Sequence, residues 1–209
     1  MTIGKEGLKF ILPSAGLAAL FGALSFWPAA GFFLLLAAAF TFFFRDPRRT
    51  PPEGEHLLVS PADGMVLSVD ALPSHPDLPG PVNRVTIFLS ILDVHFVRSP
   101  LAATVSRMDY NPGKFLPAYK PEAGEVNESR TMVLKGGKSD LVMKMIVGVA
   151  ARRIKSYVRE GEAVDRGRKV GLMYFGSRVE IFLPREVAVI AAPRQKVKGG
   201  ESVIAEVRP

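Results

Sequence analysis

Few side chains in this sequence are suited to acid–base or nucleophilic chemistry. Its 209 residues include three histidines and no cysteine. The absence of cysteine excludes disulfides, thiolate metal sites and cysteine nucleophiles. With so few candidate ligands, no metal site is predicted. His75 lies in a proline-rich turn and His56 precedes an apolar run, so both are interpreted as structural or surface residues.

His95 and Asp63 are the stronger acid–base candidates. His95 follows a strand-like run and lies close in sequence to Asp93 and Arg98. A histidine held at a strand end beside an acid can act as a base, although a satisfied structural histidine is the simpler interpretation of His95 alone. Asp63 occupies the turn Ser-Pro-Ala-Asp-Gly between two strand-like runs. Taken alone, it is explained by backbone hydrogen bonds that close the turn.

The Gly176-Ser177 junction, between two strand-like runs, is a candidate self-cleavage site. Glycine has no Cβ, so Gly176 can adopt unusual dihedrals and expose its carbonyl group to the next hydroxyl. An activated Ser177 could attack that carbonyl in an N→O acyl shift. β-Elimination of the resulting ester and hydrolysis of the dehydroalanine would leave a pyruvoyl group. A Gly-Ser dipeptide is common in turns, so the junction alone predicts nothing.

The motifs taken together are far more specific than any one of them. In order, they are Ser60–Gly64, Asp93–Pro100, Asn127–Arg130, Val147–Gly167 and Phe175–Val179. This series resembles the short-type phosphatidylserine decarboxylase proenzymes, from about Arg45 to Leu183. The apolar N-terminus is also similar.

The resemblance implies an enzyme that makes its own cofactor. Cleavage at Gly176-Ser177 would give a β chain (1–176) and an α chain (177–209), which stay in a tight complex. The covalent pyruvoyl group, derived from Ser177, would form a Schiff base with the amine of phosphatidylserine. Decarboxylation would yield phosphatidylethanolamine, a step of phospholipid biosynthesis, with the pyruvoyl group as electron sink.

The resemblance also assigns roles to individual residues. Asp63 and His95 match the family's serine-activating positions, and we expect Asp63 to orient His95, which withdraws the Ser177 proton. Long-type members carry a second histidine where this chain has Arg98, so two histidines cannot divide the work here. Arg98 and Arg130 are candidate ligands for the substrate phosphate or carboxylate. A structural ion pair with an acid such as Glu128 is the alternative for these arginines.

The elements that must position these residues are predicted to be mostly strands. Apolar runs alternate with Gly, Pro and Asp turns about every ten residues, which favours a mostly β (α+β) catalytic domain over residues 45–209, sandwich-like or barrel-like. No glycine-rich nucleotide loop is present. Only Ala151–Glu160 has mixed character. The predicted strands are Leu57–Ser60, Gly64–Val69, Arg84–Leu89, Ala102–Met108, Thr131–Lys135, Leu141–Val149, Lys169–Phe175, Ser177–Leu183 and Val187–Ile190.

Residues 1–44 are predicted to anchor the protein in a membrane. The chain carries no charged residue from Ile11 to Phe44. Pro28 divides this segment into halves of about 20–24 Å as helices, short of a ~30 Å hydrocarbon core. A helical hairpin is therefore favoured over one tilted span kinked at Pro28. Basic residues on both flanks place the catalytic domain on the cytoplasmic side of the bacterial inner membrane.

The partners follow from the charge and the resemblance. A net charge of +7 beside an apolar segment favours anionic membrane lipid over nucleic acid. The expected partners are phosphatidylserine, membrane lipids, the chain's own two fragments and a second copy in a homo-oligomer. The rival interpretation is a membrane-anchored, lipoyl-like β binding module without catalysis, although it has no modifiable lysine in a tight hairpin. An ether-linked phosphoserine lipid as substrate and an inactive family member are further alternatives.

Overall fold

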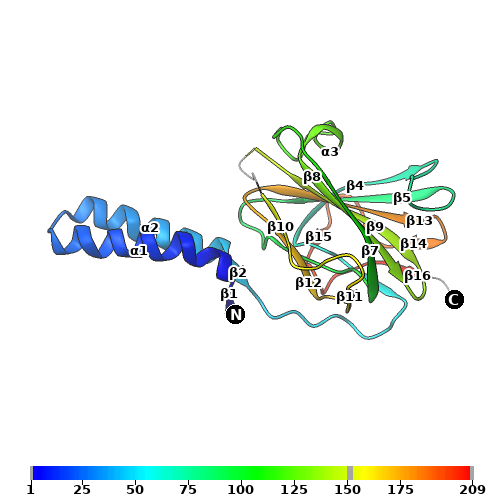
Figure 1. Cartoon of the computed structure of the whole chain (residues 1–209), viewed down its shortest axis with the longest axis horizontal. Helices are drawn as coiled ribbons and strands as arrows, with labels where there is room; N and C mark the ends of the chain where they lie inside the picture. Colours follow the sequence, from blue (N-terminus) through cyan, green and yellow to red (C-terminus); the bar gives the residue numbers. More distant parts are fainter. Residues whose placement is uncertain (1, 150–152, 208–209) are drawn as a thin grey trace. The chain divides into compact units, whose positions relative to one another are not determined.

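The computed structural model describes residues 2–149 and 153–207. The chain forms two compact units, Met1–Arg48 and Arg49–Pro209. Figure 1 shows the helices of the first unit and the strands of the second.

The first unit is a helical hairpin. Its elements are β1 (Thr2–Ile3), η1 (Lys5–Gly7), α1 (Leu8–Ala23), α2 (Trp27–Phe43) and β2 (Arg45–Asp46). Strands β1 and β2 pair antiparallel, so the hairpin closes on itself. The segment therefore forms two helices, as in the favoured prediction, and not one long kinked helix. Among the described residues, none of the helices combines the length and the apolar character needed to cross a membrane.

The break between the helices was predicted in the wrong place. The turn lies at residues 24–26, where Ser25 has a φ of 57°, and not at Pro28. Pro28 occupies the first turn of α2, where a missing N–H group leaves no hydrogen bond unmade. Stacked rings join the helices, with centroids 5.6 Å apart for Phe21 and Phe33.

The second unit is built on an antiparallel sheet of eight strands in the order β11-β7-β8-β9-β13-β5-β4-β15. Two three-stranded sheets, β10-β12-β6 and β14-β16-β3, complete it. The bounds are β3 (Leu57–Val59), β4 (Gly64–Leu72), β5 (Val82–Leu89), β6 (Phe96–Arg98), β7 (Ala103–Asn111), α3 (Ala123–Val126), β8 (Ser129–Gly136), β9 (Asp140–Val147), β10 (Ile154–Ser156), β11 (Ala163–Val164), β12 (Lys169–Met173), β13 (Ser177–Pro184), β14 (Val187–Val189), β15 (Lys196–Val197) and β16 (Val203–Val207).

The core lies on one face of the large sheet, which curls into a half-barrel (Figure 1). Strand β13 is central, between β9 and β5. Because successive side chains on a strand point to opposite faces, Val179 and Ile181 enter the main core while Arg178 and Glu180 face the other side. The prediction of a mostly β, barrel-like domain is confirmed.

All nine predicted strands are present, with shifted ends. The strands missed by the sequence analysis are β6, β10, β11, β15 and β16, and the short helix α3 was missed too. Most of these strands have two or three residues, too few for an alternating pattern to show. Part of the mixed segment Ala151–Glu160 lies outside the described residues, and β10 occupies its middle.

Candidate active site

The Gly176-Ser177 junction is a tight turn between β12 and β13. Phe175 and Gly176 both have left-handed backbones, with φ values of 51° and 68°. A phenylalanine in this region is strained, so the surrounding structure must hold it there. Ser177 is fully buried, and its Oγ has no hydrogen-bond partner among the described residues. A buried hydroxyl without a partner is costly to keep, and this one follows Gly176, which is partly exposed.

His95 lies at this junction in a defined tautomer. Its Nδ1 is 2.9 Å from the carbonyl oxygen of Asp93, which can only accept, so Nδ1 carries the proton. Its Nε2 then accepts a hydrogen bond of 3.0 Å from the backbone N–H of Gly176. The fully buried ring therefore directs a basic nitrogen at the residue that precedes Ser177.

Gly148 packs closely against the carbonyl group of Gly176, which belongs to the scissile bond. A Cβ built on Gly148 would lie 2.4 Å from the carbonyl oxygen of Gly176, so only glycine fits without movement. The strand register explains this contact. Ser177 is paired with Val147 in the β9–β13 ladder, which places the following residue, Gly148, opposite Gly176.

Comparisons with known proteins identify the family of this chain. The family model of phosphatidylserine decarboxylase matches residues 36–205. The chain is 40% identical over 205 residues to the phosphatidylserine decarboxylase proenzyme of Carboxydothermus hydrogenoformans, covering 98% of this chain and 96% of that protein. The proenzyme of Syntrophus aciditrophicus is also 40% identical, with 96% and 95% covered. The chain belongs to the phosphatidylserine decarboxylase family.

Membership of this family confirms the resemblance and the prediction of an enzyme. The proenzyme of Ehrlichia ruminantium, 37% identical over 97% of this chain, bears the same name. The rival interpretation, a lipoyl-like binding module without catalysis, is therefore wrong. The word proenzyme in these names agrees with the expectation that the chain is made as a zymogen.

Asp63, expected from the family's pattern to orient His95, contacts other groups. Its carboxylate is 2.6 Å from Nη2 of Arg49 and accepts a 2.8 Å hydrogen bond from the N–H of Gly199. Burial raises the pKa of Asp63, and these two contacts only partly oppose the shift. Nδ1 of His95 donates its hydrogen bond to the carbonyl oxygen of Asp93. The orienting role expected of Asp63 stays a prediction.

The two candidate arginines lie in different surroundings. Arg98 is buried on β6, and its Nη1 donates a 3.0 Å hydrogen bond to the carbonyl of Gly167. This contact favours the structural alternative, with a carbonyl group in place of an acid. Arg130 lies over the ring of Tyr110, 5.6 Å from its centroid, and its buried Nε has no hydrogen-bond partner within the part of the chain that the structure describes. Substrate binding by either arginine stays a prediction.

The contacts of three contributors to the site were not found from the sequence. Arg49 gave no signal by its residue type. Asp93 was named as an acid beside His95, but it acts through its backbone carbonyl group, which residue type does not reveal. Gly148 stood within a family motif, but its contact with Gly176 depends on strand pairing.

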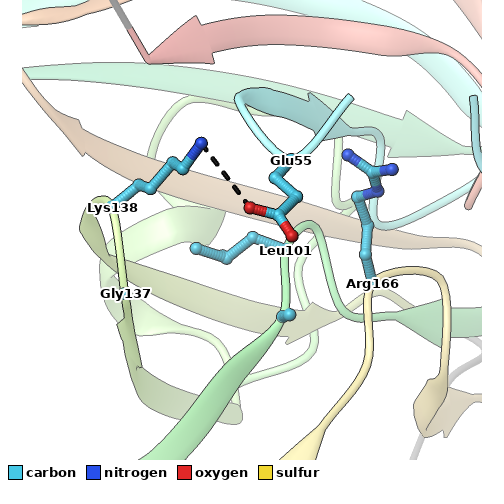
Figure 2. A pocket seen from close by; sticks show the side chains of 6 residues that line it. Glu55, Leu101, Gly137, Lys138 and Arg166 are labelled. Carbon is cyan, nitrogen blue, oxygen red and sulfur yellow. Dashed lines mark ion pairs between the residues drawn. The ribbon is translucent and has the colours of Figure 1, made fainter. Parts of the chain in front are cut away.

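Two cavities of the second unit differ in their relation to this site. One, of about 300 Å³, is lined by Glu55, Leu101, Ala102, Gly137, Lys138 and Arg166, none of them a predicted site residue. Figure 2 shows its Glu55–Lys138 ion pair, with 3.6 Å between charged atoms. The other, of about 490 Å³, is lined by Asp63, Asp93 and residues of the segment 196–202. It therefore adjoins the residues around His95. No group of three metal-ligating side chains was found within residues 2–149 and 153–207.

Proposed function

We propose that this protein converts phosphatidylserine to phosphatidylethanolamine, using a pyruvoyl group that it makes from Ser177 by cutting itself at Gly176-Ser177. Family membership supports the reaction. The observation that carries the self-cleavage is the buried, unpartnered Ser177 hydroxyl beside a left-handed Gly176 whose N–H binds His95.

The self-cleavage would proceed through an ester. Nε2 of His95 gives up its hydrogen bond from the Gly176 N–H, accepts one from the Ser177 hydroxyl, and then takes the proton of that hydroxyl. Oγ bonds to the Gly176 carbonyl carbon, the peptide C–N bond breaks, and the amide nitrogen becomes an amine. A base then removes the Cα proton of residue 177, and the Cβ–O bond breaks to release Gly176 as a carboxylate. The resulting dehydroalanine tautomerises to an imine, and water converts it to a pyruvoyl group with loss of ammonia.

The residues around Ser177 fit such a group. Ser177 is fully buried at the start of β13 and is held on both sides by β5 and β9, so its position is fixed by two strands. A pyruvoyl group supplies an electron sink for the pair released with CO₂. In the decarboxylation, Nε2 of His95 would accept a proton and return it. Nδ1 carries the proton of the neutral ring and donates it in a hydrogen bond to the Asp93 carbonyl oxygen, so Nε2 is unprotonated and able to accept.

The hairpin α1–α2 is proposed to attach the enzyme to the cytoplasmic side of the bacterial inner membrane. Large apolar side chains on it are exposed, among them Leu35 at 73% and Trp27 at 69%. Polar hydroxyls within the helices are satisfied, because Ser14 and Thr41 each donate to a carbonyl one turn back. An exposed apolar surface on helices whose hydroxyl groups are hydrogen-bonded is compatible with contact to lipid.

The test is the intact mass of the purified protein, with a carbonyl reagent alongside. Two fragments split at Gly176-Ser177, with the smaller one gaining mass with the reagent, are expected. Ser177→Ala should give one uncut and inactive chain, and His95→Ala should slow the cutting. Ser106→Ala, which removes another hydroxyl of the same domain, is the control and should mature normally. Decarboxylation of phosphatidylserine by Ser177→Ala would refute the proposal.

A further inference from the structure

Exposed apolar side chains gather in three loops of the second unit. Ile91 and Leu92 follow β5, Tyr119 precedes α3 and Val149 follows β9. Their exposed fractions are 61%, 65%, 60% and 56%. Large apolar side chains exposed together mark an interaction surface more often than isolated ones do.

These loops meet at the scissile junction. The position of a Cβ on Gly176 would lie 3.9 Å from Cγ2 of Ile91. The neighbour of Val149, Gly148, contacts the Gly176 carbonyl, and a Cβ on Gly148 would also lie 3.3 Å from the Cβ of Ala118. Strand register again explains the approach, since Ser177 pairs with Leu89 on one side and with Val147 on the other.

The loop that holds Tyr119 has the composition of a membrane-interface segment. It reads Lys-Phe-Leu-Pro-Ala-Tyr-Lys over residues 114–120, and both lysines and both aromatic residues are exposed. Aromatic rings favour the headgroup level of a bilayer, and lysines beside them attract anionic lipid.

The loop that holds Ile91 and Leu92 is fixed by hydrogen bonds. Both the N–H and the hydroxyl of Ser90 donate to the carboxylate of Asp93, at 2.8 and 2.6 Å. The same Asp93 holds His95 through its carbonyl oxygen. Through Asp93, the turn that exposes Ile91 and Leu92 is therefore linked by hydrogen bonds to the candidate base.

We propose that this surface inserts into the interface of a bilayer that contains anionic phospholipid. The surface, called the junction rim, consists of Ile91, Leu92, Lys114, Phe115, Tyr119, Lys120 and Val149. Its role as the route of the substrate rests on the proposed function. Ser177 and His95 are fully buried, whereas Gly176 between the rim loops is partly exposed. A lipid that stays in the bilayer can then present its headgroup at Gly176 only if the rim meets the membrane.

The contact is tested without any use of activity. The chain has one tryptophan, Trp27, so Trp27→Phe with Leu92→Trp carries a single reporter. The full-length protein is reconstituted in vesicles of phosphatidylserine and phosphatidylcholine with bromine near the headgroup end of the acyl chains. We expect strong quenching at position 92. Ile190→Trp in the same background is the control, since Ile190 is 52% exposed beyond β14, and it should be quenched little. Equal quenching at both positions, or none at position 92, overturns the proposal.

The substrate route is tested by comparing two forms of phosphatidylserine. The double variant Leu92→Ser and Tyr119→Ser is assayed on long-chain phosphatidylserine in vesicles and on a short-chain form dispersed below its micelle concentration. The ratio of kcat/KM for vesicles to that for the dispersed lipid should fall at least tenfold. Ile190→Ser should leave the ratio within twofold of the parent. An unchanged ratio in the double variant overturns the route. If the parent decarboxylates neither form, the proposed function fails, while the quenching result still decides the contact.

Discussion

The substitution Gly148→Ala tests whether the scissile carbonyl group is held in position for attack. An added Cβ would lie 2.4 Å from the Gly176 oxygen, whereas ordinary contacts begin at 3.4 Å. Because that neighbour is backbone, the junction must move by about 1 Å, a displacement that can reduce the rate of an aligned reaction by about 100-fold. We expect self-cleavage to slow by about 10- to 100-fold, or about 1.4 to 2.8 kcal/mol in activation free energy.

The assay follows the uncut fraction with time after a short pulse of synthesis. Gly137→Ala is the matched control, because a Cβ there meets nothing within 4 Å, and it should cut at the parent rate. Hydroxylamine distinguishes the step affected, since it cleaves the ester but not the peptide. If the acyl shift is slowed, hydroxylamine releases little extra fragment from Gly148→Ala. Cutting within twofold of the parent rate would refute the reasoning.

Three further predictions concern stability, each measured by urea unfolding in the uncut Ser177→Ala background. Burial raises the pKa of Asp63. The free energy of unfolding of the parent, relative to that of Asp63→Asn, should therefore be greatest below the unfolded pKa of about 3.9, and this advantage should be lost as the pH rises through the folded pKa. An advantage that grows with pH would contradict this. Arg178→Met leaves the buried Glu180 without its closest partner and should cost about 3 kcal/mol, most of it recovered when Glu180→Gln is added. Arg98→Met loses the hydrogen bond to Gly167 and should cost about 1.5–3 kcal/mol, and an unchanged unfolding midpoint would exclude a structural role.

The sequence by itself determined the local features of this protein. Alternating apolar runs predicted the long strands because the side-chain period of a strand is two, and that period is readable from one segment alone. Residue type and order singled out the Gly176-Ser177 junction, His95 and Asp63 as candidates, and the family resemblance gave them roles that stay predictions. The uncharged stretch from Ile11 to Phe44 indicated a helical hairpin, although the position of its turn was misplaced because a proline serves the start of a helix as well as its end.

The tertiary structure alone decided which groups meet. Asp63 pairs with Arg49, which residue type alone does not specify because many basic residues could be its partner. The His95 tautomer is fixed by a backbone carbonyl group, and a backbone contact leaves no trace in residue type. Gly148 and Ile91 reach Gly176 only through the register of β9 and β5 on either side of β13. A register is a property of whole strands, since moving one strand by a single residue would reverse its faces. The apolar rim around the junction follows from the same pairing, which brings three loops distant in sequence to one end of the sheet.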